Sequence, residues 1–357
     1  MSKLIFRMHA LLAGHGDCLW IEYGEEARPH RIVVDCGTAG TYKRLQNALD
    51  SVADIAGENE LLIITHVDAD HIAGALPLLV KQENSERFND IWFNGRPHLE
   101  PSNMLEPFGA VQGETLTRAL IDSKAPWNLT FKGQSIALTE NGAPRRVNLP
   151  GGAVLTILSP SWGKLRAMQK VWDAEVKNAG LDSTVTAPTP QPTPPGFEAF
   201  GFDVNALADW PFKEDDTIPN GTSIAFLLEY QGKTMLLGAD AHPSVLVAAL
   251  KQLKGHENLV VDLLKVPHHG SRNNISKELL ELVHCRNALF SSNGAYYQHP
   301  DKEAVARVIK YSPRGVALSF NCRSKFNEIW DSKTLASEWG YTTRFGDGQH
   351  GITVALL

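Results

Sequence analysis

The chain alternates between short apolar runs and segments in which apolar positions recur at helical spacing. The runs are bounded by Gly, Pro, Asn or Asp, which is typical of buried strands. They predict strands near residues 3–8, 17–23, 31–35, 61–65, 90–93, 153–158, 223–230, 233–238, 261–266, 287–291, 315–319 and 351–356. Helical spacing predicts helices near 41–50, 71–80, 163–178, 242–253, 274–284 and 301–310. Strands and helices mix in both halves, which favours an α/β protein with two mixed sheets face to face and helices on the outer faces, an αββα sandwich.

A segment rich in Pro and Thr separates the two halves. It reads TAPTPQPTPPG over residues 186–196 and continues into loop-like sequence to about residue 218. Proline at this density is incompatible with a helix interior or a central strand. A flap near the functional site and an insertion without a function are both open interpretations. We expect one domain over residues 1–357, with this insertion or flap at about 182–218.

Composition narrows the class of protein. The 357 residues are 43% hydrophobic, enough to bury a core without disulfides, and the formal net charge of −6 argues against a broadly basic surface for nucleic acid. The four cysteines form no C-x-x-C pair, and the chain shows neither a signal peptide nor a run of eighteen apolar residues. These features predict a cytoplasmic protein with no membrane partner, and they leave its protein partners undetermined.

The strongest chemical signal is the segment LLIITHVDADHIAGA at residues 61–75. Its apolar start predicts a buried strand, and His66, Asp68, Asp70 and His71 follow directly. Without a cation, ligand-type side chains crowded at a strand end would repel one another or stay undersolvated. Imidazoles and carboxylates together suit zinc, manganese or iron. A solvated loop with Asp70 capping the next helix is the alternative, but it accounts for one carboxylate only.

A second segment of the same kind is DLLKVPHHGS at residues 262–271. An apolar strand here ends in the paired histidines His268 and His269. One histidine at such a place is more often a core residue, but a second ligand-rich strand end favours a shared metal site.

The order of His66, Asp68, Asp70 and His71 resembles the signature H-x-[HDE]-x-D-H of the metallo-β-lactamase superfamily. With Asp at the second position, it resembles the hydrolase domain of ComEC-type DNA-uptake competence proteins and the bacterial choline-phosphate esterases. Further similar segments are GHGDCLWIEY (14–23), IVVDCG (32–37), FLLEYQGKTMLLGADA (226–241), DLLKVPHHGS (262–271) and SSNGAYYQHP (291–300). Residues 100–150 and 180–218 resemble no part of that family. The resemblance implies the family's four-layer αββα sandwich.

The resemblance also implies two divalent cations, Zn or Mn. The implied ligands are His66, Asp68, Asp70, His71, Asp240 and His268. The first two would bind one metal, the next two the second metal, and Asp240 would bridge them. One of His268 and His269 would complete the second metal, and we expect His268.

One position departs from the family pattern. The family usually supplies a third histidine to the first metal, and this chain has Asn220 at the matching place, as ComEC-type relatives tend to have. An amide oxygen suits a harder metal such as manganese better than zinc. Asp215, Asp216 and His98 are alternative ligands, with surface positions as their simpler interpretation.

The implied chemistry is hydrolysis by a metal-bound hydroxide, because two cations lower the pKa of a shared water. Asp70 would ligate the metal and orient the nucleophile. His299 is a candidate for substrate contact or leaving-group protonation, and a surface histidine is the alternative. Ser271 and Arg272 would bind a phosphate oxygen or cap the following helix. Asp35 occupies the first acidic position of the family.

The substrate class is less determined than the chemistry. Phosphodiester bonds, those of nucleic acids among them, are favoured by the resemblance and by Asp68, because an extra carboxylate favours harder metals. The acidic net charge argues against a polynucleotide, and the basic residues Lys265, Arg272, Lys302, Arg307 and Arg314 are too spread to predict a binding stripe. Two alternatives stay open. One is an acyl hydrolase for a lactone, thioester or β-lactam, which a third histidine would favour. The other is a non-catalytic sensing or binding module.

Overall fold

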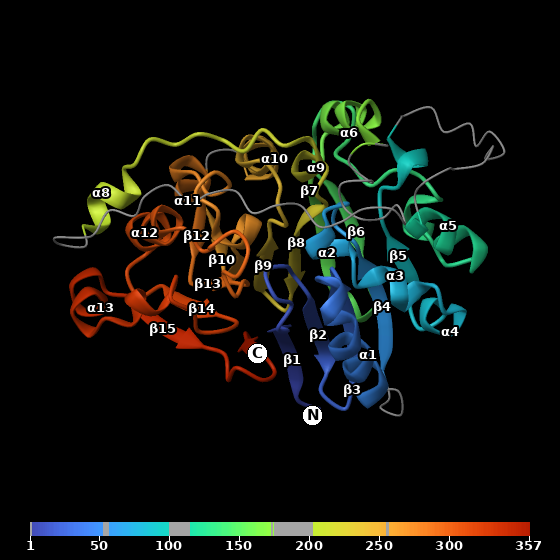
Figure 1. The fold of residues 1–357 in the computed structure, drawn as a ribbon, viewed down its shortest axis with the longest axis horizontal. Coiled ribbons are helices and arrows are strands. Elements are labelled where there is room, and N and C mark those ends of the chain that lie inside the picture. The colour runs from blue at the N-terminus through green and yellow to red at the C-terminus, as the bar shows by residue number, and fades with distance from the viewer. Residues whose placement is uncertain (1, 53–56, 100–114, 173, 175–202, 255–256) are drawn as a thin grey trace.

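Two β-sheets pack face to face in the computed structural model, which describes residues 2–52, 57–99, 115–172, 174, 203–254 and 257–357 (Figure 1). The first sheet has the order β16 (Ile352–Ala355), β1 (Leu4–Ala10), β2 (Leu19–Glu25), β3 (Arg28–Val34), β4 (Glu58–Ile63) and β5 (Asp90–Trp92). The second has the order β15 (Thr342–Phe345), β14 (Ala317–Phe320), β13 (Asn287–Phe290), β11 (Leu263–Lys265), β9 (Lys233–Leu237), β8 (Ala225–Tyr230), β7 (Val154–Ser159) and β6 (Arg145–Asn148). A separate pair consists of β10 (Leu259–Val261) and β12 (Val283–Cys285).

Each sheet is mixed, and its parallel part carries the loops that matter below. In the first sheet, β3, β4 and β5 are parallel, whereas β1 and β2 pair antiparallel with their neighbours. In the second sheet, β9, β11, β13, β14 and β15 are parallel, and β6 to β9 pair antiparallel. Parallel strands send their carboxyl ends to the same edge of a sheet, where ligand sites commonly form.

Helices cover the outer faces of both sheets (Figure 1). Those in the first half of the chain are α1 (Tyr42–Ser51), α2 (Ala69–Ile72), α3 (Ala75–Leu79), α4 (Gln82–Ser85), α5 (Thr115–Asp122) and α6 (Trp162–Gln169). Those in the second half are α8 (Val204–Ala208), α9 (Ile218–Gly221), α10 (Pro243–Lys254), α11 (Lys277–Leu282), α12 (Lys302–Tyr311) and α13 (Lys333–Trp339).

Three buried apolar clusters fill the spaces between these layers. The central one joins the two sheets, with Phe6 of β1 and Phe226 of β8 among its members. A second lies under the helices of the first sheet and includes Leu45 of α1, and a third lies under α10 to α12 and includes Leu246. Three apolar interfaces separate four layers, so the predicted αββα sandwich is confirmed.

The structure also differs from the sequence expectations at several elements. The expected helix at 71–80 is divided into α2 and α3, because the amide of Gly74 donates to the carbonyl of Gly37 at 3.0 Å. The helix expected at 274–284 ends at Leu282, and the next residues form β12 beside β10. Strands β6 and β15 and helices α5 and α13 were not anticipated.

The Pro-rich segment 186–196 lies outside the described residues, as does most of the expected insertion at 182–218. Its described end, from residue 203, contains α8 and reaches the start of α9, which carries Asn220 beyond the insertion. No helix among the described residues is long and apolar enough to cross a membrane.

Candidate metal centre

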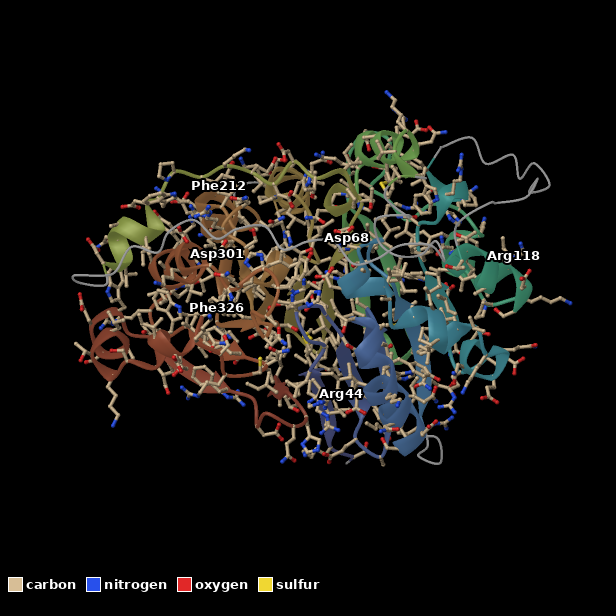
Figure 2. The ribbon with its side chains drawn as sticks, viewed as in Figure 1. Arg44, Asp68, Arg118, Phe212, Asp301 and Phe326 are labelled. Atoms are coloured by element: carbon tan, nitrogen blue, oxygen red, sulfur yellow. The ribbon has the colours of Figure 1, made fainter. Side chains whose placement is uncertain are left out.

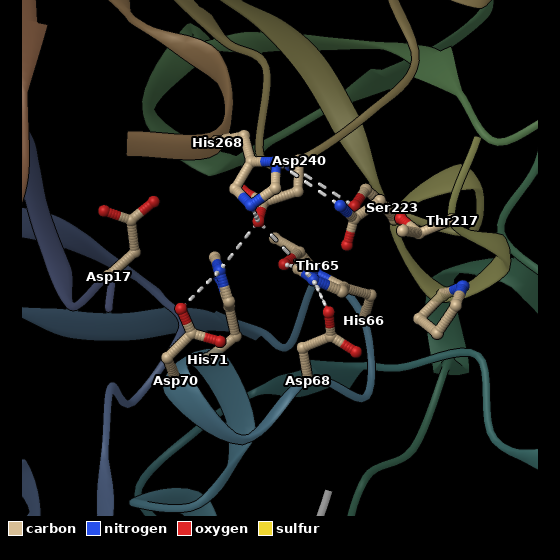
Figure 3. Close-up of polar contacts among 12 residues, drawn as sticks. Asp17, Thr65, His66, Asp68, Asp70, His71, Thr217, Ser223, Asp240 and His268 are labelled. Atoms are coloured by element: carbon tan, nitrogen blue, oxygen red, sulfur yellow. Dashed lines mark hydrogen bonds and ion pairs between the residues drawn. The ribbon is translucent and has the colours of Figure 1, made fainter. Parts of the chain in front are cut away.

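The side chains predicted as ligands gather where carboxyl ends of strands from both sheets meet (Figure 3). In the first sheet, Asp35 follows β3 and the segment from His66 to His71 follows β4. In the second sheet, Asp240 follows β9, and His268 and His269 follow β11. Figure 2 places Asp68 near the middle of the molecule, between the half that carries Arg118 and the half that carries Asp301. The site is therefore shared by both halves of the chain.

A short turn aims the ligand-type residues of the first sheet inward. Asp68 takes an extended conformation at the N-cap of α2 but makes no capping hydrogen bond with its side chain. Helix α2 has only four residues, and Asp70 and His71 both lie within it, buried. Asp70 is therefore not a helix cap, which removes the simpler interpretation of this motif.

Three side chains from the two sheets converge closely around Asp240: those of Asp70, His71 and His269. We call these three residues the inner half-site. Nε2 of His71 lies 3.3 Å from Oδ2 of Asp240 and 3.2 Å from Nε2 of His269. Nε2 of His269 lies 3.3 Å from Oδ2 of Asp70 and 3.9 Å from Oδ2 of Asp240. All four side chains are buried.

A second group, His66, Asp68 and His268, lies on another side of Asp240, and we call it the outer half-site. Nε2 of His66 is 3.6 Å from Oδ2 of Asp68 and 3.8 Å from Oδ2 of Asp240. Nε2 of His268 is 3.6 Å from the same oxygen of Asp240. Figure 3 shows Asp240 between His268 and the residues of the β4 loop. Asp240 is thus common to both half-sites.

The donor atoms of these residues fit a divalent cation. Nε2 of His66, Oδ1 of Asp240 and Oδ1 of Asn220 are buried without a hydrogen-bond partner among the described residues. Leaving a buried polar atom unpaired costs about 1–3 kcal/mol, more where the group is charged. Imidazole nitrogens and carboxylate oxygens are ligands that zinc and manganese accept. The arrangement is therefore suited to metal binding.

Asp35 holds His71 from behind. Its Oδ2 lies 2.7 Å from Nδ1 of His71 and accepts from Oγ1 of Thr65 at 2.9 Å, and its Oδ1 accepts from the amide of Thr65 at 2.8 Å. A carboxylate at Nδ1 of a ligand histidine fixes the tautomer that leaves Nε2 free for a metal. The structure thus places Asp35 behind a predicted ligand.

Asn220 and His268 are joined by a second carboxylate, Asp215. Oδ2 of Asp215 accepts from the amides of Asn220 at 2.5 Å and of Asn274 at 2.9 Å. Nδ1 of His268 lies 2.8 Å from Oδ1 of Asn274 and 3.5 Å from Asp215. Asp215 therefore orients residues around the outer half-site. Its Oδ1 also accepts a hydrogen bond from the amide of Thr217.

Electrostatic coupling in the cluster is strong. Burial alone would raise the pKa of Asp70, but His71 and His269 outweigh it, so the pKa of Asp70 is lowered. Burial likewise would raise the pKa of Asp240, but His268 and His71 outweigh it and hold that pKa well below its usual range. Burial would lower the pKa of each paired histidine, yet Asp240 raises the pKa of His268 to about 10, and Asp17 with Asp240 raises the pKa of His269 to about 9. The buried carboxylates are thus stabilised by nearby positive charge, which either protons on the histidines or a metal can supply.

His299 lies next to the outer half-site. Its ring centroid is 5.5 Å from that of His268, and its Nδ1 is 3.4 Å from Oδ1 of Asp301. Burial lowers the pKa of His299, although Asp301 acts in the opposite direction. The ring of Tyr297 stacks on His299 with centroids 5.9 Å apart, and Tyr297 itself is 49% exposed.

The remaining predicted residues have other contacts. Oγ of Ser271 accepts from the amide of Asn273 at 3.2 Å, and Arg272 pairs with Glu303 at 3.0 Å. Neither caps α11, because Ser276 is the N-cap there. These two residues therefore do not serve as the cap that the sequence left open.

Two of the alternative ligands lie in different surroundings. His98 packs edge-on against Trp127 with centroids 4.6 Å apart, and burial lowers its pKa to about 4. Asp216 is exposed.

Sequence reasoning did not assign a role to Asp17. Its ligand atoms and those of His71, Asp240 and His269 lie within 4.8 Å of one another, and it forms an ion pair with Lys265. The available signal was a lone acidic residue in GHGDCL and a lone lysine in the apolar DLLKVP. Two of the five scattered basic residues considered in the sequence, Lys265 and Arg307, are buried and contribute no exposed charge.

No protein-family model matches the chain, and no curated protein matches it. Solved structures with a similar course of the chain include the metallo-beta-lactamase fold protein YhfI from Bacillus subtilis, with 12% identity and a TM-score of 0.41 over 98% of this chain and 99% of that one. A mutant of the CmlA beta-hydroxylase has 12% identity and a TM-score of 0.39 over 100% of this chain, which spans 54% of that protein. Zn(2+)-bound PqqB from Methylobacterium extorquens has 11% identity and a TM-score of 0.37 over 98% of this chain and 99% of that one. At these TM-scores the three structures support no functional assignment. The function proposed below therefore rests on the site itself.

Proposed function

We propose that this protein is a metal-dependent hydrolase of the metallo-β-lactamase superfamily that acts on phosphodiester bonds. One observation carries the proposal: imidazoles and carboxylates from both sheets converge on buried atoms that have no hydrogen-bond partner among the described residues, namely Nε2 of His66 and Oδ1 of Asp240. Such an arrangement is costly for a protein that binds no cation.

Two divalent cations, Zn or Mn, would bind in the two half-sites. Asp70, His71 and His269 would hold one, His66, Asp68 and His268 the other, and Asp240 would contact both. This assignment gives His269 to the half-site of Asp70, where the sequence favoured His268. When bound, the cations would supply Lewis acidity that generates hydroxide from water and neutralises charge on the scissile group.

Residues around the cations would position the reactants. Asp70 would accept a hydrogen bond from the attacking water, since its carboxylate stays ionised. His299 lies beside His268 of the outer half-site, and we propose that its ring contacts an oxygen of the substrate. The unpartnered amide oxygen of Asn220 would face the outer cation, which suits a hard metal.

Two features support a phosphodiester of limited size. Asp68 adds a carboxylate to the outer half-site and makes it more anionic, which favours the harder metals common in phosphoryl chemistry. Long polynucleotides need several exposed cationic contacts, whereas Lys265 and Arg307 are buried and Arg272 is paired with Glu303. We therefore propose a small phosphodiester or the end of a nucleic-acid strand.

The proposal is tested by release of nitrophenol from bis(p-nitrophenyl) phosphate. Protein freed of metal by a chelator is compared with protein resupplied with Mn²⁺ or Zn²⁺. We expect turnover only after resupply, and a loss of about a hundredfold or more in Asp70→Asn, because Asp70 would both ligate and orient. Asp209→Asn is the matched control, since Asp209 pairs with Lys310 through an exposed contact away from the site.

The same preparations are assayed with p-nitrophenyl acetate and a chromogenic β-lactam. Hydrolysis of these esters and amides without hydrolysis of the phosphodiester would replace our proposal with an acyl hydrolase. A folded protein that binds cations and turns over none of the substrates would instead support a sensing module.

A further inference from the structure

A buried ion pair lies directly behind the inner half-site. Lys265 is the last residue of β11, and Asp17 lies in the loop between β1 and β2. Nζ of Lys265 is 2.6 Å from Oδ2 of Asp17, and both side chains are almost fully buried. Nζ also donates to the carbonyl of Val266 at 3.1 Å. Burying two charges is weakly stabilising at best, so this pair is poorly explained by stability alone.

The second oxygen of Asp17 faces His269. Oδ1 of Asp17 lies 3.5 Å from Nδ1 of His269, and the same Nδ1 lies 2.9 Å from the carbonyl oxygen of Ser291. Nε2, on the other side of the ring, faces His71 and Asp70. Asp17 therefore approaches the ring nitrogen that points away from the half-site. Figure 3 accordingly shows Asp17 to one side of Asp70 and His71. This geometry makes Asp17 a support for a ligand, although its distance to the cluster would also permit ligation.

Each histidine of the inner half-site has a carboxylate near its Nδ1, by a hydrogen bond in His71 and by an ion-pair contact in His269, whose Nδ1 donates its hydrogen bond to the carbonyl of Ser291. His71 has the carboxylate of Asp35 at its Nδ1, and His269 has the carboxylate of Asp17 near its Nδ1. Asp35 is held by two hydrogen bonds from Thr65, whereas Asp17 is held by the ammonium group of Lys265. The lysine also cancels the charge of Asp17, so the support adds no net charge behind the site.

The loop that carries Asp17 is also tied to the ligand loop. The amide of Asp17 donates to the carbonyl of Asp70 at 3.2 Å. A shift of Asp17 would therefore disturb both Asp70 and His269, which belong to the same half-site. The outer half-site makes no comparable contact with Asp17 among the described residues.

We propose that Asp17 and Lys265 are a positioning pair that fixes His269 for cation binding in the inner half-site. The inference rests on the proposed function in that it assumes a cation there. Asp17 acts on the ring through its ion-pair contact with Nδ1, beside the hydrogen bond of Nδ1 to Ser291, and Lys265 keeps the carboxylate in place. The pair therefore sets the affinity of one half-site and not of the other.

The test is stepwise Zn²⁺ binding, measured by competition with a chromophoric chelator, in the parent protein, Asp17→Asn, Lys265→Met and the double variant. Supports of this kind are worth about 10- to 100-fold in metal affinity. We expect Asp17→Asn and the double variant to weaken one of the two binding steps by that factor and leave the other within twofold. The exposed pair of Lys3 and Glu26, 2.9 Å apart, supplies the matched control, and Lys3→Met should change neither step.

Two outcomes would overturn the positioning role. One is a folded Asp17→Asn protein whose two steps both match the parent, and the other is equal weakening of both steps. Asp17→Asn alone decides the question if the double variant does not fold, because its amide oxygen still accepts from Lys265. A parent that binds Zn²⁺ as proposed but hydrolyses no phosphodiester would remove the proposed function and leave this inference in place. A parent that binds no Zn²⁺ would remove both.

Discussion

At the scale of single residues, Asp35 is a buried carboxylate outside the proposed ligand set that holds one of the proposed ligands, His71. Replacing it by alanine removes the acceptor for Nδ1 of His71 and for both donors of Thr65. We expect Asp35→Ala to weaken Zn²⁺ binding by about 10- to 100-fold. We expect it also to lower the free energy of unfolding by about 1–3 kcal/mol, because buried donors lose their partner. Chelator competition and urea denaturation measure the two effects.

Asp262 provides the control for this substitution. It is also buried and accepts from the amide of Thr234 at 3.0 Å, but its partners lie away from the ligands. The Asp262→Ala protein should therefore be less stable than the parent but bind Zn²⁺ with the same affinity. Equal metal affinity in Asp35→Ala and the parent would show that His71 needs no carboxylate behind it.

The paired histidines can be separated by their coupling to Asp70. His269 lies 3.3 Å from Asp70, whereas the contacts of His268 are with Asp240, Asn274 and Asp215. If His269 and Asp70 share a cation, losing either should abolish the same binding step. We therefore expect His269→Ala and Asp70→Ala to be non-additive in metal affinity, and His268→Ala and Asp70→Ala to be nearly additive. The reverse pattern in double-mutant cycles would restore His268 to the half-site of Asp70.

The sequence indicated the ligand types at residue scale, but it did not indicate their supports. His66, Asp68, Asp70 and His71 are adjacent in the chain, so a motif exposes them. Asp17 and Lys265 come from distant segments, and only folding shows that their side chains meet. Position 220 was indicated by the family resemblance, whereas its hydrogen bond to Asp215 was not.

At the scale of elements, the loop between β1 and β2 packs backbone to backbone against the loop after β4, which carries four of the proposed ligands. A Cβ atom on Gly16 would lie 1.7 Å from the carbonyl oxygen of Asp70, closer than any real contact. We expect Gly16→Ala to force the two loops apart, with a loss of about 1–3 kcal/mol in stability and weaker Zn²⁺ binding. Gly40→Ala is the control, because the nearest atom to its Cβ would be 3.9 Å away. Equal unfolding midpoints and Zn²⁺ affinities in the two variants would contradict this tight packing.

Elements with clear apolar patterns were predictable, and those decided by pairing were not. Strand β8, which reads AFLLEY, is a nearly continuous apolar run, as a buried strand should be. From the sequence, the residues of β12 were interpreted as the end of a helix. In the structure these three residues gain a strand conformation from parallel pairing with β10, which their own sequence does not indicate. Strand β6 alternates between exposed and half-buried residues at a sheet edge, which leaves little apolar signal.

At the scale of the whole molecule, the proposed cations would join the two sheets. The ligands from the β4 loop belong to the first sheet, and Asp240, His268 and His269 belong to the second. A cation that binds only the folded protein stabilises it by about 2.7 kcal/mol at a hundredfold excess over Kd. We therefore expect chelation to lower the unfolding temperature by several degrees and Zn²⁺ to restore it, in scanning calorimetry. Asp240→Asn, which removes the carboxylate that both half-sites share, should respond much less. A parent protein with the same unfolding temperature in chelator and in excess Zn²⁺ would mean that no cation bridges the sheets.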